Sequence, residues 1–258
     1  MKKVIVTILV VALLISIMSA GCEGVVTGSG NLETKQYNFS DFNRVDIGYA
    51  FEVEIDQSSS YSISITADDN LFEYIQVSKE GETLKIGLKR IISLGPVTLK
   101  AEVTMPQLRG LELSGATRGT VSGFSSTENL DVEVSGASSL DLVDISAGDV
   151  KCEVSGASKV TGDITAADAD FDVSGASTVQ LEGSAIDIVV DASGASRVKL
   201  AAFPINNATV ALSGASSGTV NLDGRLDADL SGASKLEYIG KPTMGTINTS
   251  GGSTLNKK

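Results

Sequence analysis

Apolar and polar residues alternate strictly over much of the second half of the chain. In the stretches 130–134, 150–154 and 169–173, the first, third and fifth residues are apolar and the two between them are charged. Apolar residues return at every second position shortly afterwards, for example at Leu140 and Leu142. A period of two predicts short β-strands with one buried face.

The motif Ser-Gly-Ala-Ser, or a close variant, joins each pair of predicted strands. A unit of this length cannot bury its own apolar face and becomes stable only by stacking on its neighbours. We therefore predict an all-β fold, a parallel β-helix or β-solenoid of about eight two-strand coils with a 19–20 residue repeat over residues 108–258. The motifs begin at Ser114, Ser135, Ser155, Ser174, Ser193, Ser213, Ser231 and Ser250.

The residue types of this motif suit a tight corner between stacked coils. Glycine accepts a positive φ and the close approach of a neighbouring backbone, where a Cβ would obstruct. Alanine leaves room inside the bend. The serine hydroxyls can bond corner backbone groups or the matching serine one coil away.

Residues 31–107 differ from the repeats because they hold eight of the twelve aromatic residues. Alternating stretches at 51–55, 61–65, 84–88 and 97–103 predict further strands. A solenoid would otherwise expose unpaired strand edges and core at its open end. We therefore predict an N-terminal, aromatic-rich β cap, with residues 31–258 forming one continuous domain. We interpret its aromatic residues as core rather than as a stacking platform for sugar rings.

Residues 1–21 have the composition of an export signal. Lys2 and Lys3 precede an apolar run from Val4 to Met18, which the small residues 19–21 close. The run is shorter than the ~20 residues needed to span a bilayer. It predicts a cleaved signal peptide of the lipoprotein type rather than a permanent transmembrane helix.

Cys22 directly follows this leader. Ser-Ala-Gly-Cys resembles the lipobox of prokaryotic lipoproteins, although Ser19 stands where leucine is commonest. We predict lipidation of Cys22, with simple secretion after cleavage behind Gly21 as the alternative. Acyl chains would anchor the protein at a membrane surface of the prokaryotic cell envelope, with about 0.8 kcal/mol per buried CH₂. Residues 22–30 would form a flexible, extracytoplasmic tether.

The charge balance and the residue content exclude several classes of function. The net charge is −12, and removing the leader takes away two lysines and no acid, which leaves 18 basic and 32 acidic side chains, or −14. Such a surface repels nucleic acid, whose binding depends on neutralising phosphates. The chain has no histidine, which excludes His-based catalysis and His-ligated zinc. No cofactor is expected.

The second cysteine, Cys152, stands three residues before Ser155, where other repeats carry valine or phenylalanine. We predict that it behaves as a small hydrophobe in the core. If Cys22 is lipidated, no cysteine remains to pair with it.

Two outward positions of the coils carry patterns of charge. Four residues after the first serine, a base alternates with a hydroxyl residue; two residues before it, six of the eight repeats carry an acid. Stacked in register, these acids form an acidic ladder. We favour a solvated face that opposes further stacking over a face that binds a cation, such as Ca²⁺, or a partner. The base and hydroxyl series is Arg118, Ser139, Lys159, Thr178, Arg197, Ser217, Lys235 and Thr254, and the acids are Glu112, Glu133, Glu153, Asp172, Asp191 and Asp229.

The chain resembles the DUF2807 family of auto-transporter adhesin "head GIN" domain proteins. The resemblance implies an extracytoplasmic β-helix-like fold, often on lipoproteins, and it carries over no catalytic residue. It covers nearly the whole mature chain. It rests on Gly28-Ser-Gly30, Phe42–Gly48, Phe51–Ile55, Asp69–Leu71, Leu84–Ile86, Met105–Leu108 and Leu111–Ala116, followed by the Ser-Gly-Ala-Ser repeats.

We therefore expect a non-catalytic, surface-anchored β-solenoid that mediates adhesion or cell-envelope interactions with a protein or glycan. A carbohydrate-active enzyme is one alternative. It would require a localised carboxylate pair that breaks the repeat, whereas the acids here recur evenly. A calcium-binding structural module is the other alternative.

Overall fold

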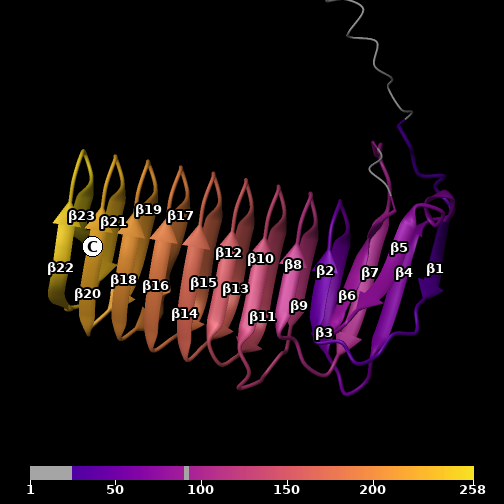
Figure 1. The fold of residues 1–258 in the computed structure, drawn as a ribbon, viewed down its shortest axis with the longest axis horizontal. Helices are drawn as coiled ribbons and strands as arrows, with labels where there is room; N and C mark the ends of the chain where they lie inside the picture. Colours follow the sequence, from indigo (N-terminus) through magenta and orange to yellow (C-terminus); the bar gives the residue numbers. More distant parts are fainter. Residues whose placement is uncertain (1–24, 90–92) are drawn as a thin grey trace, which may run out of the picture.

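A computed structural model describes residues 25–89 and 93–258 of the chain. The predicted signal peptide and Cys22 lie outside the described residues. The described part is an elongated rod of stacked parallel coils with a different arrangement of strands at one end (Figure 1). The all-β class and the parallel β-solenoid predicted from the repeats are confirmed.

Two long sheets form the rod, and each coil contributes one strand to each of them. In order from the cap end, the twelve-stranded sheet contains β1 (Leu32–Gln36), β4 (Ser62–Asp68), β7 (Leu99–Met105), β3 (Glu52–Gln57), β9 (Arg118–Ser122), β11 (Ser139–Ser146), β13 (Lys159–Thr165), β15 (Thr178–Ser184), β17 (Arg197–Ile205), β19 (Ser217–Leu222), β21 (Lys235–Ile239) and β23 (Thr254–Lys257). The eleven-stranded sheet contains β5 (Ile75–Glu80), β6 (Thr83–Leu88), β2 (Arg44–Ile47), β8 (Gly110–Leu113), β10 (Leu130–Val134), β12 (Val150–Val154), β14 (Asp168–Val173), β16 (Asp187–Ala192), β18 (Asn207–Leu212), β20 (Arg225–Leu230) and β22 (Thr243–Thr249).

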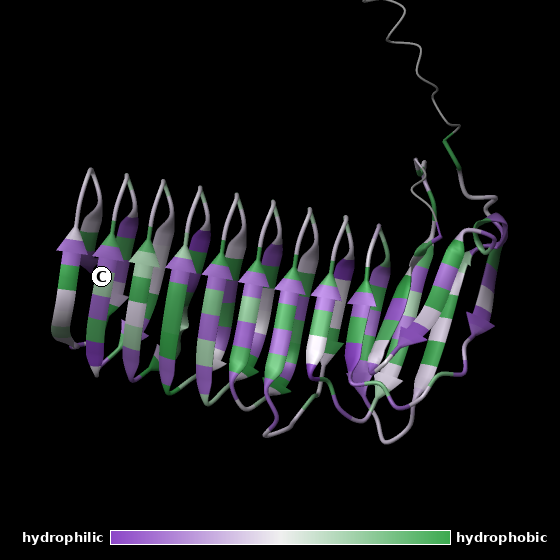
Figure 2. Ribbon diagram, viewed as in Figure 1, coloured by the Kyte–Doolittle hydropathy of each residue, from purple (hydrophilic) through white to green (hydrophobic). Residues whose placement is uncertain are grey.

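The core fills the space between the two sheets, and the alternation read from the sequence decides which side chains enter it. Apolar and polar bands alternate along the strands (Figure 2). Parallel register places equivalent residues side by side, so that Cys152 lies between Val132 and Phe171. The predicted core position of Cys152 is confirmed, since it is 2% exposed. Burial, helped by the charge of Glu153, raises the pKa of its thiol to about 12, which makes it unreactive at neutral pH.

The Ser-Gly-Ala-Ser corners form a hydrogen-bonded column along one edge of the rod. Gly175 has a φ of 72°, and the other motif glycines have similar positive values. The N–H of Ala176 donates to the carbonyl oxygen of Gly156 at 2.8 Å, and the N–H of Ala195 donates to that of Gly175 at 2.8 Å. A Cβ on Gly175 would collide with the carbonyl oxygen of Gly156. Glycine is therefore required both by conformation and by stacking.

The region before the repeats contains a coil of its own. Strands β2 and β3 stack on β8 and β9 in parallel, with Val45 beside Leu111 and Ile55 beside Val121. The corner of this coil is the segment 48–51, in which Tyr49 takes the glycine position with a φ of 75°. The solenoid therefore begins inside the segment 31–107.

The remaining strands of this region close the end of the rod. Strand β4 pairs antiparallel with both β1 and β7, and β5 pairs antiparallel with β6 (Figure 1). Phe42 and Phe51 are buried here, and the ring of Phe42 lies 4.8 Å from that of Tyr61. The helical turn η2 (Asp69–Leu71) follows β4. Among the described residues, no helix is long and apolar enough to cross a membrane.

The segment that leads into β1, predicted as part of a flexible tether, is hydrogen-bonded to the cap from Val26 onwards. The N–H of Val26 donates to the carbonyl oxygen of Ser93 at 2.9 Å. The carboxylate of Asp68 is buried and accepts hydrogen bonds from the N–H groups of Gly30 and Thr98, both at 2.8 Å. The bond from Thr98 and then that from Gly30 hold the pKa of Asp68 below its ordinary value. We call residues 26–30 the strap, because these hydrogen bonds tie the start of the described chain to the cap.

Candidate functional site

The acidic ladder predicted from the repeats lies on the outer face of the eleven-stranded sheet. Glu112, Glu133 and Glu153 lie side by side in register, and the row continues through Asp172 to Asp191. Asp229 is on the same line, but Ala211 separates it from Asp191. The structure therefore brings together five of the six predicted acids as an unbroken row.

The cap extends this row by residues that the repeat did not identify. Asp46 on β2 lies beside Glu112, and Lys85 on β6 lies beside Asp46. The ammonium group of Lys85 is 2.8 Å from a carboxylate oxygen of Glu80. The signal in the sequence is the alternation Val45-Asp46-Ile47, which matches the repeats although no Ser-Gly-Ala-Ser motif follows it.

Partial burial and mutual repulsion disfavour the ionised form of several ladder acids. Burial is the largest cause of the raised pKa of Glu112, and the charges of Asp46 and Glu133 raise it further. The pKa values of Asp46 and Asp172 are also raised, in each case chiefly by burial. The ladder therefore opposes folding at neutral pH, when its carboxylates are ionised.

Replacing Asp172 with asparagine is expected to stabilise the fold at pH 7 by about 0.2–1 kcal/mol, the usual size of a cross-strand pair effect. The amide removes a carboxylate that burial and the charges of Asp191 and Glu153 destabilise. Because the folded pKa of Asp172 is raised, its ionised form costs stability above that pKa, and the cost disappears as the pH falls below the unfolded value of 3.8. Denaturant titrations at pH 7 and pH 3 should show the gain only at pH 7.

The matched control for this variant is Asp170→Asn on the same strand. Asp170 lies between Lys151 and Val189 rather than between two acids. We expect no gain in stability from this change, because it removes the attraction to Lys151 together with a repulsion of Asp172 that is weaker than those of Asp191 and Glu153. Equal gains in the two variants would contradict a repulsive ladder.

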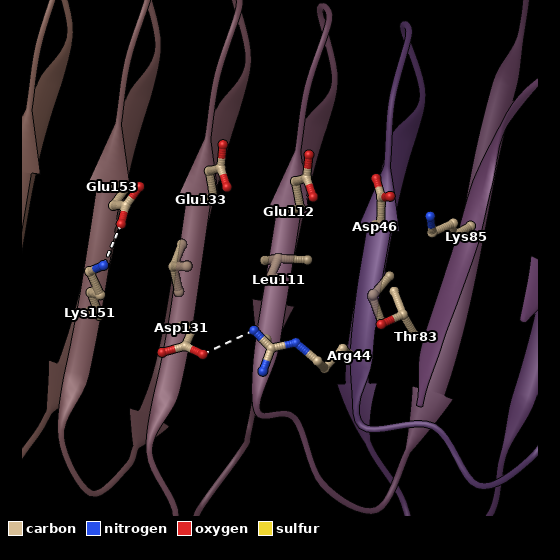
Figure 3. Close-up of a pocket in the computed structure, with 13 residues that line it drawn as sticks. Arg44, Asp46, Thr83, Lys85, Leu111, Glu112, Asp131, Glu133, Lys151 and Glu153 are labelled. Carbon is tan, nitrogen blue, oxygen red and sulfur yellow. Dashed lines mark hydrogen bonds and ion pairs between the residues drawn. The ribbon is translucent and has the colours of Figure 1, made fainter. Parts of the chain in front are cut away.

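A groove of about 480 Å³ lies over the cap end of this face (Figure 3). The side chain of Arg44 crosses Gly110, and its Nη2 is 2.9 Å from Oδ2 of Asp131. A Cβ on Gly110 would lie 2.6 Å from Cζ of Arg44, so Arg44 can take this path to Asp131 only over a residue without a side chain and would have to shift over any other. The groove is lined by Arg44, Asp46, Lys85, Glu112, Asp131, Glu133 and Lys151 together with neighbouring residues.

The arrangement of the carboxylates decides what chemistry they can support. Ladder neighbours project from equivalent positions of successive strands, about 4.8 Å apart, and lie in a row without facing one another across a gap (Figure 3). A glycosidase requires two carboxylates on opposite sides of a bound sugar. Over residues 25–89 and 93–258, no group of three or more His, Cys, Asp or Glu side chains is placed to hold a metal ion. The geometry suits contact along an extended partner.

The twelve-stranded sheet presents a different row on the opposite face. Register places Arg118, Ser139, Lys159, Thr178 and Arg197 side by side in that order, as the spacing predicted. The three bases of this series are exposed. In the part of the chain that the structure describes, none of the three makes an ion pair or a side-chain hydrogen bond.

The bases at the two ends of this row are neutralised. Nζ of Lys100 lies 3.1 Å from a carboxylate oxygen of Glu52 at the cap end. Nζ of Lys235 lies 2.6 Å from a carboxylate oxygen of Glu237 near the other end. The unpaired bases therefore lie in the middle of the rod.

The fold and these two rows define a β-solenoid that presents an acidic ladder on one long face and a row of alternating bases and hydroxyl residues on the other. The chain belongs to the DUF2807 family, described as "putative auto-transporter adhesin, head GIN domain", whose model matches residues 41–242. The resemblance drawn from the sequence is thus confirmed. A comparison with curated proteins found no match.

Solved structures of low sequence identity share the fold. A protein of Parabacteroides merdae described as a putative adhesin has a TM-score of 0.81 at 18% identity, over 90% of this chain and 98% of that one. A protein of Parabacteroides distasonis described as a putative lipid binding protein has a TM-score of 0.78 at 19% identity, over 91% and 100%. A putative adhesin of Bacteroides fragilis has a TM-score of 0.67 at 22% identity, over 90% and 100%.

Proposed function

We propose that this protein is a non-catalytic, exported and membrane-anchored β-solenoid that mediates adhesion or cell-envelope interactions. The observation that carries the proposal is the pair of charged rows, which run in register along opposite faces of one rod. The adhesin family and the fold shared with adhesins support an adhesion-type role at the cell surface. An extended surface of this kind fits a long partner better than a small substrate, since small ligands bind in concave pockets.

The strap supports a defined orientation on the membrane if Cys22 carries the lipid. Three residues, Glu23, Gly24 and Val25, separate Cys22 from Val26, which is hydrogen-bonded to the cap. An extended chain spans at most about 3.3–3.6 Å per residue, so the cap lies within roughly 14 Å of the lipidated residue. The last coil is at the opposite end of the rod (Figure 1). The cap end would therefore face the membrane and the charged faces would extend along the rod.

Replacing Cys22 with serine is expected to release the protein from the membrane. The wild-type chain should label with radioactive palmitate and enter the detergent phase, because acyl chains bury apolar surface in lipid. The variant should lose the label completely and fractionate as a water-soluble exported protein, with an unchanged melting curve. Cys152→Ser is the control for a general loss of cysteine and should label normally. Palmitate labelling of the Cys22 variant would contradict the anchor.

The adhesion role is tested by the binding of the mature chain, carrying Cys22→Ser for solubility, to whole cells, envelope extracts and a glycan array. We expect saturable binding by the folded protein and none after thermal unfolding. No retention on any of the three would overturn the proposal. A parallel screen for release of reducing ends from polysaccharides separates binding from catalysis, since product formation would contradict a non-catalytic role.

A further inference from the structure

The strongest unexplained surface is the row of unpaired bases on the twelve-stranded sheet. We call Arg118, Lys159 and Arg197 the basic row. Hydroxyl residues occupy the alternate coils, with Ser139 and Thr178 between these bases. Glu52 on the neighbouring strand β3 lies beside Arg118, but its carboxylate pairs with Lys100 at 3.1 Å. Lys159 and Arg197 have only serine and threonine beside them on the neighbouring coils. The stack therefore leaves the three cations exposed and free.

The residues beside the basic row add no net charge to it. Two positions further along each strand, the parallel row from Thr120 to Lys199 holds one acid, Asp141, and one further exposed base, Lys199. Oδ1 of Asp141 accepts a hydrogen bond from the hydroxyl of Thr161 at 3.0 Å. The strip between Arg118 and Lys199 thus carries four bases and one acid on a chain whose net charge is −12.

This strip is electrostatically separated from the acidic ladder. The ladder lies on the other sheet, and packed sheets are about 10 Å apart, so charges on their outer faces are further apart still. The Debye length at physiological ionic strength is about 8 Å. An anion lying against the twelve-stranded sheet therefore responds chiefly to the local positive strip rather than to the ladder.

The spacing of the bases indicates the shape of the anion. Bases on every second coil are about 9.6 Å apart, twice the strand spacing. An extended pair of pyranose rings has about this length, so a polysaccharide with one carboxylate per disaccharide can place a carboxylate at each base. The intervening hydroxyls of Ser139 and Thr178 then face the sugar ring between two carboxylates. Arginine adds bidentate geometry suited to carboxylates.

We propose that the basic row binds an extended acidic polysaccharide that carries one carboxylate per disaccharide. The proposal rests on the adhesion role and names the class of partner for one face of the rod. A second copy of the chain is a poorer occupant, because its acidic ladder repeats on every coil and two chains of net negative charge repel each other. The rigid stack fixes the spacing of the three backbone positions before binding, which lowers the entropic cost of holding an extended chain.

Hyaluronan is a suitable probe, since it carries a carboxylate on every disaccharide and no sulfate. Biolayer interferometry with the mature chain carrying Cys22→Ser should show binding that weakens as NaCl rises, and no binding of neutral dextran. Affinity should increase with oligosaccharide length up to the hexasaccharide, which supplies three carboxylates for three bases. Changing the row to serine (Arg118→Ser, Lys159→Ser and Arg197→Ser) should weaken binding roughly tenfold or more.

Serine is a conservative choice at these positions because Ser139 and Ser217 already occupy the same line of the stack. The matched control removes three lysines outside the twelve-stranded sheet (Lys85→Ser, Lys151→Ser and Lys241→Ser) and should leave hyaluronan binding unchanged. Equal weakening by both triple variants would overturn the proposal, since it would show a general charge effect. Dextran sulfate binding with no hyaluronan binding would overturn it as well.

Two further outcomes separate this proposal from the adhesion role. Suppose that the wild-type chain binds cells, that added hyaluronan does not compete with this binding, and that the triple serine change at the basic row does not weaken it. The polysaccharide proposal is then overturned and the adhesion role stands. If hyaluronan binds through the basic row and no cell binding occurs, adhesion fails and the polysaccharide proposal stands. Self-association of the wild type that depends on Arg118, measured by light scattering, would identify a second copy as the occupant and overturn the proposal.

Discussion

Replacing Gly175 with alanine is expected to destabilise the solenoid by about 3 kcal/mol or more. The φ of 72° at this corner is a left-handed conformation that costs a residue with a Cβ about 1–2 kcal/mol. The Cβ would also collide with the carbonyl oxygen of Gly156, which accepts the hydrogen bond of Ala176 at 2.8 Å. Relieving the collision requires the two coils to separate locally. Guanidinium chloride titrations followed by far-UV circular dichroism measure the loss.

Gly123→Ala separates the conformational cost from the collision. Gly123 has a φ of 74°, close to that of Gly175, but no atom lies within 4 Å of the position that its Cβ would take. We expect this control to cost about 1–2 kcal/mol, the conformational part alone. Equal destabilisation by the two variants would show that contact between stacked corners is not a reason for glycine at Gly175.

The corners and the charged rows could be predicted because a solenoid converts sequence spacing into spatial register. Each coil is aligned on its own motif, so residues at one offset from the motif become neighbours in space. Glu133 and Glu153 share an offset and lie side by side, and the same holds for Arg118 and Ser139. The local conformation of the corner is also determined by few residues, since glycine accepts the left-handed backbone that the turn requires.

The coil formed by β2 and β3 could not be predicted in this way, because its neighbours in space are distant in sequence. The chain leaves the stack after β3, forms the cap and returns at β8, so that β2 pairs with both β6 and β8. Its corner reads Gly48-Tyr49-Ala50-Phe51, without the repeat's serines. The ladder residue Asp46 and the ion pair between Arg44 and Asp131 depend on this long-range pairing. No local pattern specifies it.

The outward positions carry the information about function, because the fold places few demands on them. Inward residues such as Val173 and corner residues such as Gly175 are constrained by packing and stacking. Arg118 and Lys159 are exposed and contribute nothing to the core. Unpaired bases that persist in a mainly acidic chain are therefore better explained by a partner than by stability, since exposed ion pairs add little and unpaired exposed bases add less.

Replacing Phe171 with alanine is expected to cost about 3–5 kcal/mol, the usual range for a fully buried phenylalanine. Phe171 is 0% exposed, and its ring makes an edge-on contact with Phe203 from the other sheet at 6.4 Å and 81°. It lies between Cys152 and Val190 in the stack, so the cavity weakens both neighbouring interfaces. Since each coil is stabilised by its neighbours, the denaturation curve should broaden or split as the two ends of the rod unfold separately.

Val189→Ala is the control for the Phe171 variant, because Val189 lies on the outer side of the adjacent strand β16 and is 48% exposed. Its cost should stay within about 0.5 kcal/mol. A double-mutant cycle with Phe203→Ala should give a coupling energy of about 0.5–1.5 kcal/mol for the ring pair. A loss below about 1 kcal/mol for Phe171→Ala, with a single sharp transition, would contradict this role of Phe171. It would mean that the contact between Phe171 and Phe203 does not hold the two sheets together.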